Sequence, residues 1–315
     1  MEIDISKQNE LSLVRRLYIY QNERFPVVAH GLLISAFTFS AISYSRICRG
    51  GNGFVRLGDY VIGVLLTVSL FLLVRIFDEF KDKEEDAKYR SYLPVPRGLI
   101  SFKELNILAV AIVVFQCALL LVYQPNMFWL YGIVMLYLLL MRVEFFIPSY
   151  LKKHQILYIT SHMVIIPLID IYASGIDWLI GGAHPHWGLA FFFAVSYLNG
   201  LVLEFGRKIR APQFEEEGVI SYTSLYGTRK GTWYYLVLMF LTLLGACAAS
   251  YYVGFGVIAF VILGILFVLC AFPAFLFIRC PGKKLSKQIE YFSALWTISM
   301  YLTLGAVPMI KSLLS

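Results

Sequence analysis

The sequence carries little charge for its length. Charged side chains make up 15% of the 315 residues, whereas soluble domains carry about 25%. Hydrophobic side chains make up 59%. This composition argues against a water-soluble fold and indicates a membrane protein.

Cysteine pairs and a leader segment are also absent. The five cysteines are Cys48, Cys117, Cys247, Cys270 and Cys280. None forms a Cys-x-x-Cys pair, and three lie in apolar runs, so we expect small buried apolar residues. Residues 1–24 contain no short apolar segment with a small-residue cleavage site. We therefore expect no signal peptide, and insertion depends on the first membrane helix.

Long apolar runs are what the sequence has instead. A helix needs about 20 apolar residues to cross the hydrocarbon core. Nine runs meet this length, at roughly 25–45, 58–77, 105–124, 127–146, 155–173, 187–205, 233–250, 253–278 and 290–312. Unpaired backbone is too costly in lipid, and the runs lack the period-two alternation of barrel strands. We predict an all-α integral membrane fold, a nine-helix bundle that forms a single domain over 1–315.

The basic residues predict the orientation of the bundle. With the N-terminus in the cytosol, 21 of the 27 lysines and arginines lie in inside segments and four in outside segments. The positive-inside rule then places residues 1–24 in the cytosol and the C-terminus on the opposite side. This distribution explains the net charge of +7 through the membrane, so we expect no nucleic-acid partner. We expect a multi-pass protein of a bacterial inner membrane.

Two loops stand out by length and charge. They span about 78–104 and 206–232, and the predicted orientation makes both cytosolic. Long loops in compact folds are often functional. We predict that these two loops form a cytosolic cap that carries the active site.

The first loop opens with closely spaced acids. Asp78, Glu79, Asp82 and Asp86 follow the spacing i, i+1, i+4, i+8. On a helix, Asp78, Asp82 and Asp86 share one face, where like charges repel unless a cation joins them. Oxygen ligands without His or Cys suit Mg²⁺ or Mn²⁺, and Mg²⁺ often adds substrate phosphates to its shell. The pattern predicts a magnesium–diphosphate site; the alternative is a solvated helix end whose acids pair with nearby lysines.

Basic residues near the acids are candidates for binding phosphate. Arg90 and Arg97 flank a turn fixed by Pro94 and Pro96. Arginines bind phosphate oxygens bidentately, although these two could equally be cytosolic anchors. A second group, Arg207, Lys208 and Arg210, follows the end of the sixth run. As a group they are candidates for diphosphate oxygens, whereas each alone fits a positive-inside anchor.

A few polar residues lie in or beside the apolar runs. They are Glu144, His162, Asp170, Asn199 and Glu204. Ionisable residues inside a membrane are functional candidates, because they are costly without a partner. We expect His162 and Asp170, eight residues apart, to share one helix face and to line an acceptor pocket or act as a base; hydrogen bonds between helices are the alternative. We expect Glu144 to pair with Arg142 or Lys152.

The acidic pattern resembles the first motif of the UbiA superfamily of intramembrane prenyltransferases, N-D-x-x-D-x-x-x-D. Here Asp78 stands for the asparagine, Glu79 for the first aspartate, and Asp82 and Asp86 complete the motif. The turn Pro94-x-Pro96-Arg97-Gly98 resembles the R-P-L-x-S-G segment of the family. Nine spans, a cytosolic N-terminus and a charged loop after the sixth helix also match, so the resemblance covers most of the chain.

The second motif departs from the family pattern. That pattern is commonly D-x-x-x-D shortly before a glycine, and the segment from Gly218 to Gly227 resembles its tail. No aspartate lies in 204–217. In a shifted register, Glu204 and Glu215 take the place of the aspartates, with Glu216 third. The segment that ends in Lys153 is similar to the tyrosine and Lys-Arg element after the fourth helix of the family.

The resemblance implies a specific chemistry. Mg²⁺ or Mn²⁺ is expected on Asp78, Glu79, Asp82, Asp86, Glu204 and Glu215. Diphosphate oxygens are expected on Lys81, Arg90, Arg97, Lys153, Arg207, Lys208 and Arg210. Loss of diphosphate leaves an allylic carbocation in an apolar cavity shielded by aromatic rings, and an acceptor attacks it.

The expected partners are therefore a prenyl diphosphate, a small-molecule or lipid acceptor, and membrane lipids. Two alternatives remain open at this point. A terpene cyclase on the same scaffold would quench the cation internally. A cation transporter would use Glu144, Asp170 and Glu204 as an ion path, although the sequence shows no pair of related halves. The oligomeric state is open.

Overall fold

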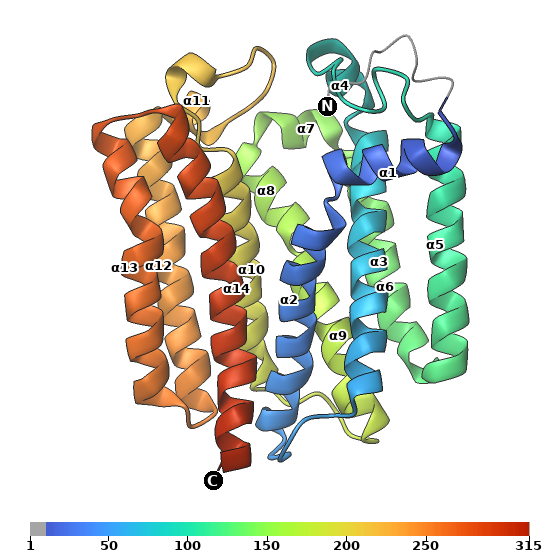
Figure 1. Cartoon of the computed structure of the whole chain (residues 1–315), viewed down its shortest axis with the longest axis vertical. Helices are drawn as coiled ribbons and strands as arrows, with labels where there is room; N and C mark the ends of the chain where they lie inside the picture. The colour runs from blue at the N-terminus through green and yellow to red at the C-terminus, as the bar shows by residue number, and fades with distance from the viewer. Residues whose placement is uncertain (1–10, 315) are drawn as a thin grey trace.

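The computed structural model describes the backbone of residues 11–314 and the side chains of residues 11–311 (Figure 1). Residues 1–10, part of the segment expected in the cytosol, lie outside the described residues. The described chain consists of helices and connecting turns, without a strand. The all-α expectation is therefore confirmed.

Nine helices in the described part of the chain are long and apolar enough to cross a membrane. Their bounds are α2 (Val27–Cys48), α3 (Leu57–Lys81), α5 (Phe102–Tyr123), η2 with α6 (Pro125–Met127 and Phe128–Arg142), α8 with α9 (Gln155–Met163 and Ile165–Ile180), α10 (Leu189–Arg207), α12 (Thr228–Tyr252), α13 (Gly256–Arg279) and α14 (Lys283–Leu314). Each matches one predicted run. The last helix begins seven residues before the predicted 290, because its polar first turns extend out of the apolar run with their backbone hydrogen bonds intact.

The short helices gather at one end of the bundle. They are α1 (Leu13–Arg24), α4 (Lys83–Tyr89), α7 (Pro148–Lys153) and α11 (Tyr222–Tyr226), with the turns η3 (Glu144–Phe146) and η4 (Pro212–Phe214). In Figure 1, α1, α4, α7 and α11 lie at the top, and the end of α14 lies at the bottom. Both long loops therefore emerge at the end that carries α1. We call this end the loop end and the other the far end.

The long helices form one bundle. Helix α14 packs against α2 and α13, α12 packs against α10 and α13, and α9 packs against α2 and α6. Apolar side chains fill the interior, with Trp178, Trp296 and Tyr235 among the largest buried ones. Many exposed side chains are also apolar, such as Val122 and Val257. Such an apolar exterior fits a lipid environment, because lipid tails are as apolar as a protein interior.

The fifth span is broken into two helices. Helix α8 ends at Met163 and α9 begins at Ile165. Pro167 explains the break, because it lacks the N–H that would bond the carbonyl group of Met163, and its ring clashes with that carbonyl group. His162 and Asp170 therefore lie on different helices. The expectation of one continuous face is wrong, although both side chains are buried.

Helix α1 lies across the loop end and is tied to α5. The Ser101 hydroxyl accepts a hydrogen bond from the Glu104 backbone N–H, and the Glu104 carboxylate accepts one from the Ser101 N–H, which together cap α5. The same carboxylate binds the Arg16 guanidinium at 2.5 Å and 3.1 Å. One glutamate thus starts a membrane helix and fixes α1 beside it.

A buried carboxylate joins α2 to α9 near the far end. The Asp177 side chain is fully buried and accepts hydrogen bonds from Arg49 at 2.7 Å and 2.9 Å and from Ser45 at 2.8 Å. The Arg46 guanidinium lies 3.8 Å away. Removal of one partner of such a pair leaves a charge without compensation, which costs more than the pair itself contributes.

Asp177→Asn should therefore destabilise the protein by about 3 kcal/mol, because Arg49 loses its charged partner. In a thermal melt in detergent micelles we expect the midpoint to fall by roughly 5 °C or more. The control is Glu290→Gln, which removes a surface pair with Lys287 and should cost less than about 1 kcal/mol. Equal midpoints for the two variants would contradict the structural role of Asp177.

Candidate functional site

The acids of the first loop keep the helical spacing through a bend. Helix α3 ends at Lys81, and Asp82 lies between α3 and α4. The Asp82 N–H still donates to the Asp78 carbonyl oxygen at 2.9 Å, and the Asp86 N–H donates to the Asp82 carbonyl oxygen at 2.8 Å. The four carboxylates divide by exposure. Asp78 and Asp82 are 30% and 28% exposed, whereas Glu79 and Asp86 are 1% and 3% exposed.

Glu79 and Asp86 form the closed pair, enclosed by three arginines. Glu79 binds Arg24 at 2.6 Å and Arg75 at 2.9 Å. Asp86 binds Arg90 at 2.8 Å and faces Arg24 at 3.6 Å. Burial raises the pKa of the Asp86 carboxyl, while Arg90 and Arg24 oppose that shift. The positive charge that these two acids need is thus supplied by the protein itself.

Asp78 and Asp82 form the open pair and share one lysine. The Lys81 ammonium lies 2.9 Å from Asp78 Oδ1 and 3.9 Å from Asp82 Oδ1. Burial raises the pKa of Asp82 to about 6, and the negative charges of Asp78 and Asp86 add to that shift, whereas Lys81 opposes it. The Arg75 guanidinium, which binds Glu79 at 2.9 Å, also lies 3.8 Å from Asp78 Oδ2. The open pair thus shares its cations with Glu79, and both of its carboxylates stay partly exposed, so a further cation can reach them.

Glu204 lies at the loop end of α10 and holds two cations. Its carboxylate binds Lys208 at 2.7 Å and Arg207 at 2.5 Å. The charge of Arg207 also acts on Asp78 across the bundle. Of the basic group after the sixth span, Arg207 is thus the member whose charge reaches the open pair, while Glu204 is occupied by its own neighbours. That the group binds diphosphate stays a prediction.

Hydroxyl groups of the second loop hold Glu215. Glu215 Oε1 accepts hydrogen bonds from Ser221 at 2.7 Å and Thr223 at 2.8 Å. Its other oxygen, Oε2, is buried without a hydrogen-bond partner in the described part of the chain. Glu216 binds Arg210 at 2.8 Å. Of the predicted acids of this loop, only Glu215 has a buried oxygen left to bind something.

The two long loops touch each other. The Tyr92 hydroxyl donates to Glu216 at 3.3 Å. Gly218 has φ +72, and a Cβ there would lie 2.3 Å from the Tyr89 ring. Only glycine allows this approach, because it combines a left-handed backbone with no side chain. That the loops form a cytosolic cap remains a prediction.

Several predicted phosphate ligands have carboxylate partners. Arg90 binds Asp86, and Arg97 binds Glu23 of α1 at 2.8 Å. Lys152 pairs with Glu85 at 2.9 Å, and the Arg142 guanidinium lies over the Phe77 and Phe80 rings. The charge of Glu144 acts on Lys152, but neither Lys152 nor Arg142 forms the expected ion pair with Glu144 among the described residues.

The intramembrane candidates separate by depth. His162 is buried on α8, in reach of the charges of Lys81, Asp78 and Glu204. Asp170 and Asn199 are buried deeper, where the Ser196 hydroxyl lies close to Asp170 without completing a hydrogen bond. Asn199 Nδ2 lies 3.7 Å from Met300 Sδ. Only His162 of this group thus adjoins the charged site.

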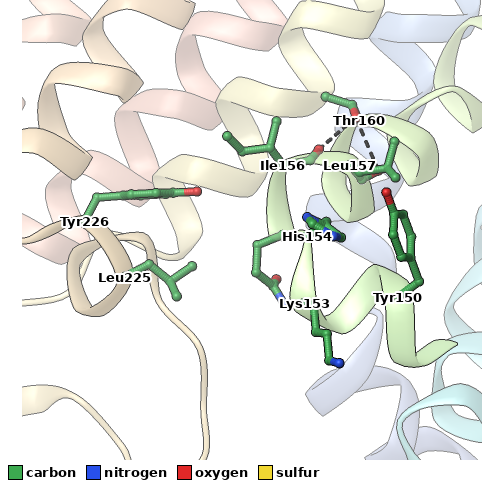
Figure 2. Close-up of a pocket in the computed structure, with 9 residues that line it drawn as sticks. Tyr150, Lys153, His154, Ile156, Leu157, Thr160, Leu225 and Tyr226 are labelled. Carbon is green, nitrogen blue, oxygen red and sulfur yellow. Dashed lines mark hydrogen bonds between the residues drawn. The ribbon is translucent and has the colours of Figure 1, made fainter.

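Two cavities flank the charged residues. The larger, about 580 Å³, lies between α7–α8 and α11 and is lined by Lys153, His154, Tyr150 and Tyr226 among others. Figure 2 shows Leu225 and Tyr226 on one wall, with Lys153, His154, Ile156 and Leu157 on the other. The smaller, about 220 Å³, adjoins the closed pair and the turn that contains Pro96. Lys153 is thus the predicted phosphate ligand that lines open space.

The carboxylates suit a magnesium ion bound by the open pair better than one bound by all six predicted acids. No group of three or more His, Cys, Asp or Glu side chains among residues 11–311 is arranged to hold a metal. Asp78 and Asp82 offer two adjacent, half-buried carboxylates. Mg²⁺ usually takes one or two carboxylates and completes its shell with water and phosphate oxygens. The six-acid ligand set stays a prediction.

Sequence reasoning missed the ion pairs that Arg75 and Arg24 form with the closed pair. Arg75 precedes Glu79 by four residues, a spacing that indicates a helical ion pair and could have identified it. Arg24 reaches Glu79 across 55 residues, a contact for which the sequence holds no local signal.

Arg24→Gln should loosen α1, because Glu79 and Asp86 lose a shared guanidinium and one buried charge becomes less well compensated. We expect chymotrypsin to cut after the buried Tyr20 at least about tenfold faster than in the unaltered protein. Arg15→Gln, at an exposed position of the same helix, is the control. Unchanged cleavage in Arg24→Gln would show that the contact does not hold α1.

Comparison with known proteins gives a consistent result. The sequence profile of the UbiA prenyltransferase family matches residues 32–298. A structure of digeranylgeranylglyceryl phosphate synthase superposes with a TM-score of 0.60 at 15% identity, over 94% of this chain and 99% of that one. The apo structure of a UbiA homologue from Aeropyrum pernix K1 superposes with a TM-score of 0.66 at 14% identity, over 90% and 98%. No curated protein matches the sequence.

These structural likenesses show the fold, and the profile match shows the family. The match runs from α2 into α14, so it includes the acids of both long loops. The chain is a multi-pass integral membrane protein that belongs to the UbiA prenyltransferase family.

Proposed function

We propose that the protein is a magnesium-dependent prenyltransferase that moves a prenyl group from a prenyl diphosphate to a small-molecule or lipid acceptor. The observation that carries the proposal is the open pair. Asp78 and Asp82 lie four residues apart at the loop end of α3, and Lys81 lies 2.9 Å from Asp78 and 3.9 Å from Asp82, while Arg75 lies 3.8 Å from Asp78. Both carboxylates are partly exposed, and such a pair at the boundary of an apolar bundle would suit a divalent metal that binds a lipid diphosphate.

Asp78 and Asp82 would hold the metal. Bound there, Mg²⁺ or Mn²⁺ supplies positive charge that makes diphosphate a better leaving group. Lys81 contacts Asp78 and the charge of Arg207 acts on it, so these two, with Lys208 beside Arg207 on Glu204, would take up charge on the departing oxygens. Glu204 holds Arg207 and Lys208 in place for this task.

The remaining residues would position the substrate and exclude water. Arg97 and Glu23 hold the proline turn against α1, and the closed pair holds α1 against α3 and α4. The prenyl chain would extend from this end into the apolar bundle. Tyr158, whose ring faces the Lys81 ammonium at 5.5 Å, is one of the aromatic rings available to shield an allylic cation.

The proposed orientation places the loop end in the cytosol of a bacterial inner membrane. The distribution of lysine and arginine supports it, because both long loops and α1 lie at this end. A soluble phosphorylated substrate or product would then exchange with the cytosol.

The contacts do not favour a cation transporter. Glu204, one of the three acids that a transporter would use, is held by two cations of the protein itself. A cyclase would use the same charged site. Release of cyclic hydrocarbon or cyclic alcohol from a prenyl diphosphate without acceptor would move the assignment to a cyclase.

Asp78→Asn and Asp82→Asn should each lower magnesium-dependent diphosphate release from geranylgeranyl diphosphate by roughly 100-fold or more, because each removes a charge from the proposed metal site. Purified protein in lipid nanodiscs and a phosphate-coupled assay measure this. Glu84→Gln, an exposed acid of the same segment, is the control. Normal turnover in both aspartate variants would refute the proposal.

Metal affinity should depend on pH near neutrality. The pKa of Asp82 is raised to about 6, so its metal-binding charged form predominates only above that pH. We expect Mn²⁺, followed by electron paramagnetic resonance, to bind about tenfold more weakly at pH 5 than at pH 7. Asp82→Asn should remove most of this difference, and an affinity that does not change over this range would contradict the assignment of Asp82 as a ligand.

A further inference from the structure

Two aromatic rings pack against the buried His162 side chain. Its side chain is 4% exposed on α8. One face of the imidazole stacks on Tyr158, with ring centroids 4.2 Å apart, and the Phe145 ring meets it edge-on at 5.7 Å. Two aromatic rings from different segments therefore fix the plane of the imidazole.

The backbone fixes which nitrogen carries the proton. His162 Nδ1 lies 2.8 Å from the carbonyl oxygen of Tyr158. A carbonyl oxygen can only accept, so Nδ1 carries the hydrogen and Nε2 presents its lone pair. Nε2 is buried and has no hydrogen-bond partner among the described residues. Buried polar atoms in proteins are nearly always satisfied, so an unsatisfied one requires an explanation.

A strained turn delivers Phe145 to this ring. Glu144, Phe145 and Phe146 have φ values of 47, 53 and 61. Side chains of this size rarely adopt left-handed backbone, and three in a row are rarer still. Such strain persists where the surroundings enforce it and tends to occur at functional sites. Here the strained turn places the Phe145 ring against His162.

The imidazole stands beside the charged site. The Lys81 ammonium faces the Tyr158 ring at 5.5 Å, and His162 stacks on that same ring. The charges of Lys81, Asp78 and Glu204 all act on His162. Residues two apart on a helix point to nearly opposite faces, so Tyr158 and His162 face away from Ile156 and Thr160, which line the large cavity of Figure 2.

The carboxylates nearby all have cationic neighbours. Asp78 and Asp82 face Lys81, and Glu204 binds Arg207 and Lys208. The closed pair is surrounded by arginines. His162 Nε2 differs from them, because its lone pair has no hydrogen-bond partner among the described residues.

We propose that His162 Nε2 is the base that accepts the proton of the acceptor, a molecule that attacks through a hydroxyl group. The proposal rests on the proposed prenyl transfer. The C1–O bond to diphosphate breaks and its electron pair leaves with the diphosphate. The hydroxyl oxygen forms the new bond to C1, and its proton passes to Nε2. The imidazolium then returns the proton to water or to the released diphosphate.

Positional isotope exchange separates this step from ionisation. Geranylgeranyl diphosphate with ¹⁸O in the bridging position scrambles the label into non-bridging positions whenever the C1–O bond breaks and re-forms. Water serves as the hydroxyl acceptor, and geranylgeraniol is the product measured. The variant is His162→Asn, whose amide N–H can still donate to the Tyr158 carbonyl group while Nε2 is removed.

We expect His162→Asn to form geranylgeraniol at least about 100-fold more slowly, since a positioned base contributes that much or more. Isotope exchange should stay within about threefold of the unaltered protein, because ionisation does not need the base. His162→Gln should behave likewise, so that misfolding of one variant cannot explain the result. Both variants should still bind geranylgeranyl thiolodiphosphate. His184→Gln, at an exposed histidine of the far end, is the matched control.

Three results would overturn the proposal or its basis. Product formation within threefold of normal in both variants would show that Nε2 is not the base. Loss of isotope exchange together with product would show that His162 acts in ionisation or folding. No exchange and no product in the unaltered protein would instead refute the proposed prenyl transfer itself.

Discussion

The placement of carboxylates at the loop end of α3 governs the rest of the structure. Four acids at and just beyond the end of a membrane helix must find positive charge, because like charges at helical spacing repel and burial raises the cost. The protein encloses Glu79 and Asp86 with guanidinium groups and leaves Asp78 and Asp82 partly exposed, with Lys81 near both and Arg75 3.8 Å from Asp78. The first pair builds the loop end, and the second remains free to act.

This division links architecture to chemistry. The arginine shared by Glu79 and Asp86 comes from α1, so the surface helix is fixed by the same acids that the family pattern assigns to the metal. At the end of α10, Glu204 holds Arg207 and Lys208, and the charge of Arg207 acts on Asp78. Charged residues of α1, α3 and α10 thus interact at the boundary of an apolar bundle, where a lipid with a charged head would fit.

Most of the fold could be predicted from the sequence, because lipid imposes simple rules. Each apolar run of sufficient length became a helix, and the basic residues gathered at the loop end. A prediction of the break at Val164 would have had to take Pro167 into account. The break separates His162 from Asp170. The candidate site was only partly predictable. The contacts of Arg24 and of Phe145 join distant segments, and no local pattern in the sequence encodes them.

The most direct measurement of the central claim is a structure determined with Mn²⁺ and geranylgeranyl thiolodiphosphate. Anomalous scattering locates the metal without reference to the assignment. The account predicts a peak between Asp78 and Asp82 that also contacts the diphosphate, with Glu79 and Asp86 still bound to their arginines. A metal centred on Glu79 and Asp86 instead, or no metal near either pair, would contradict it.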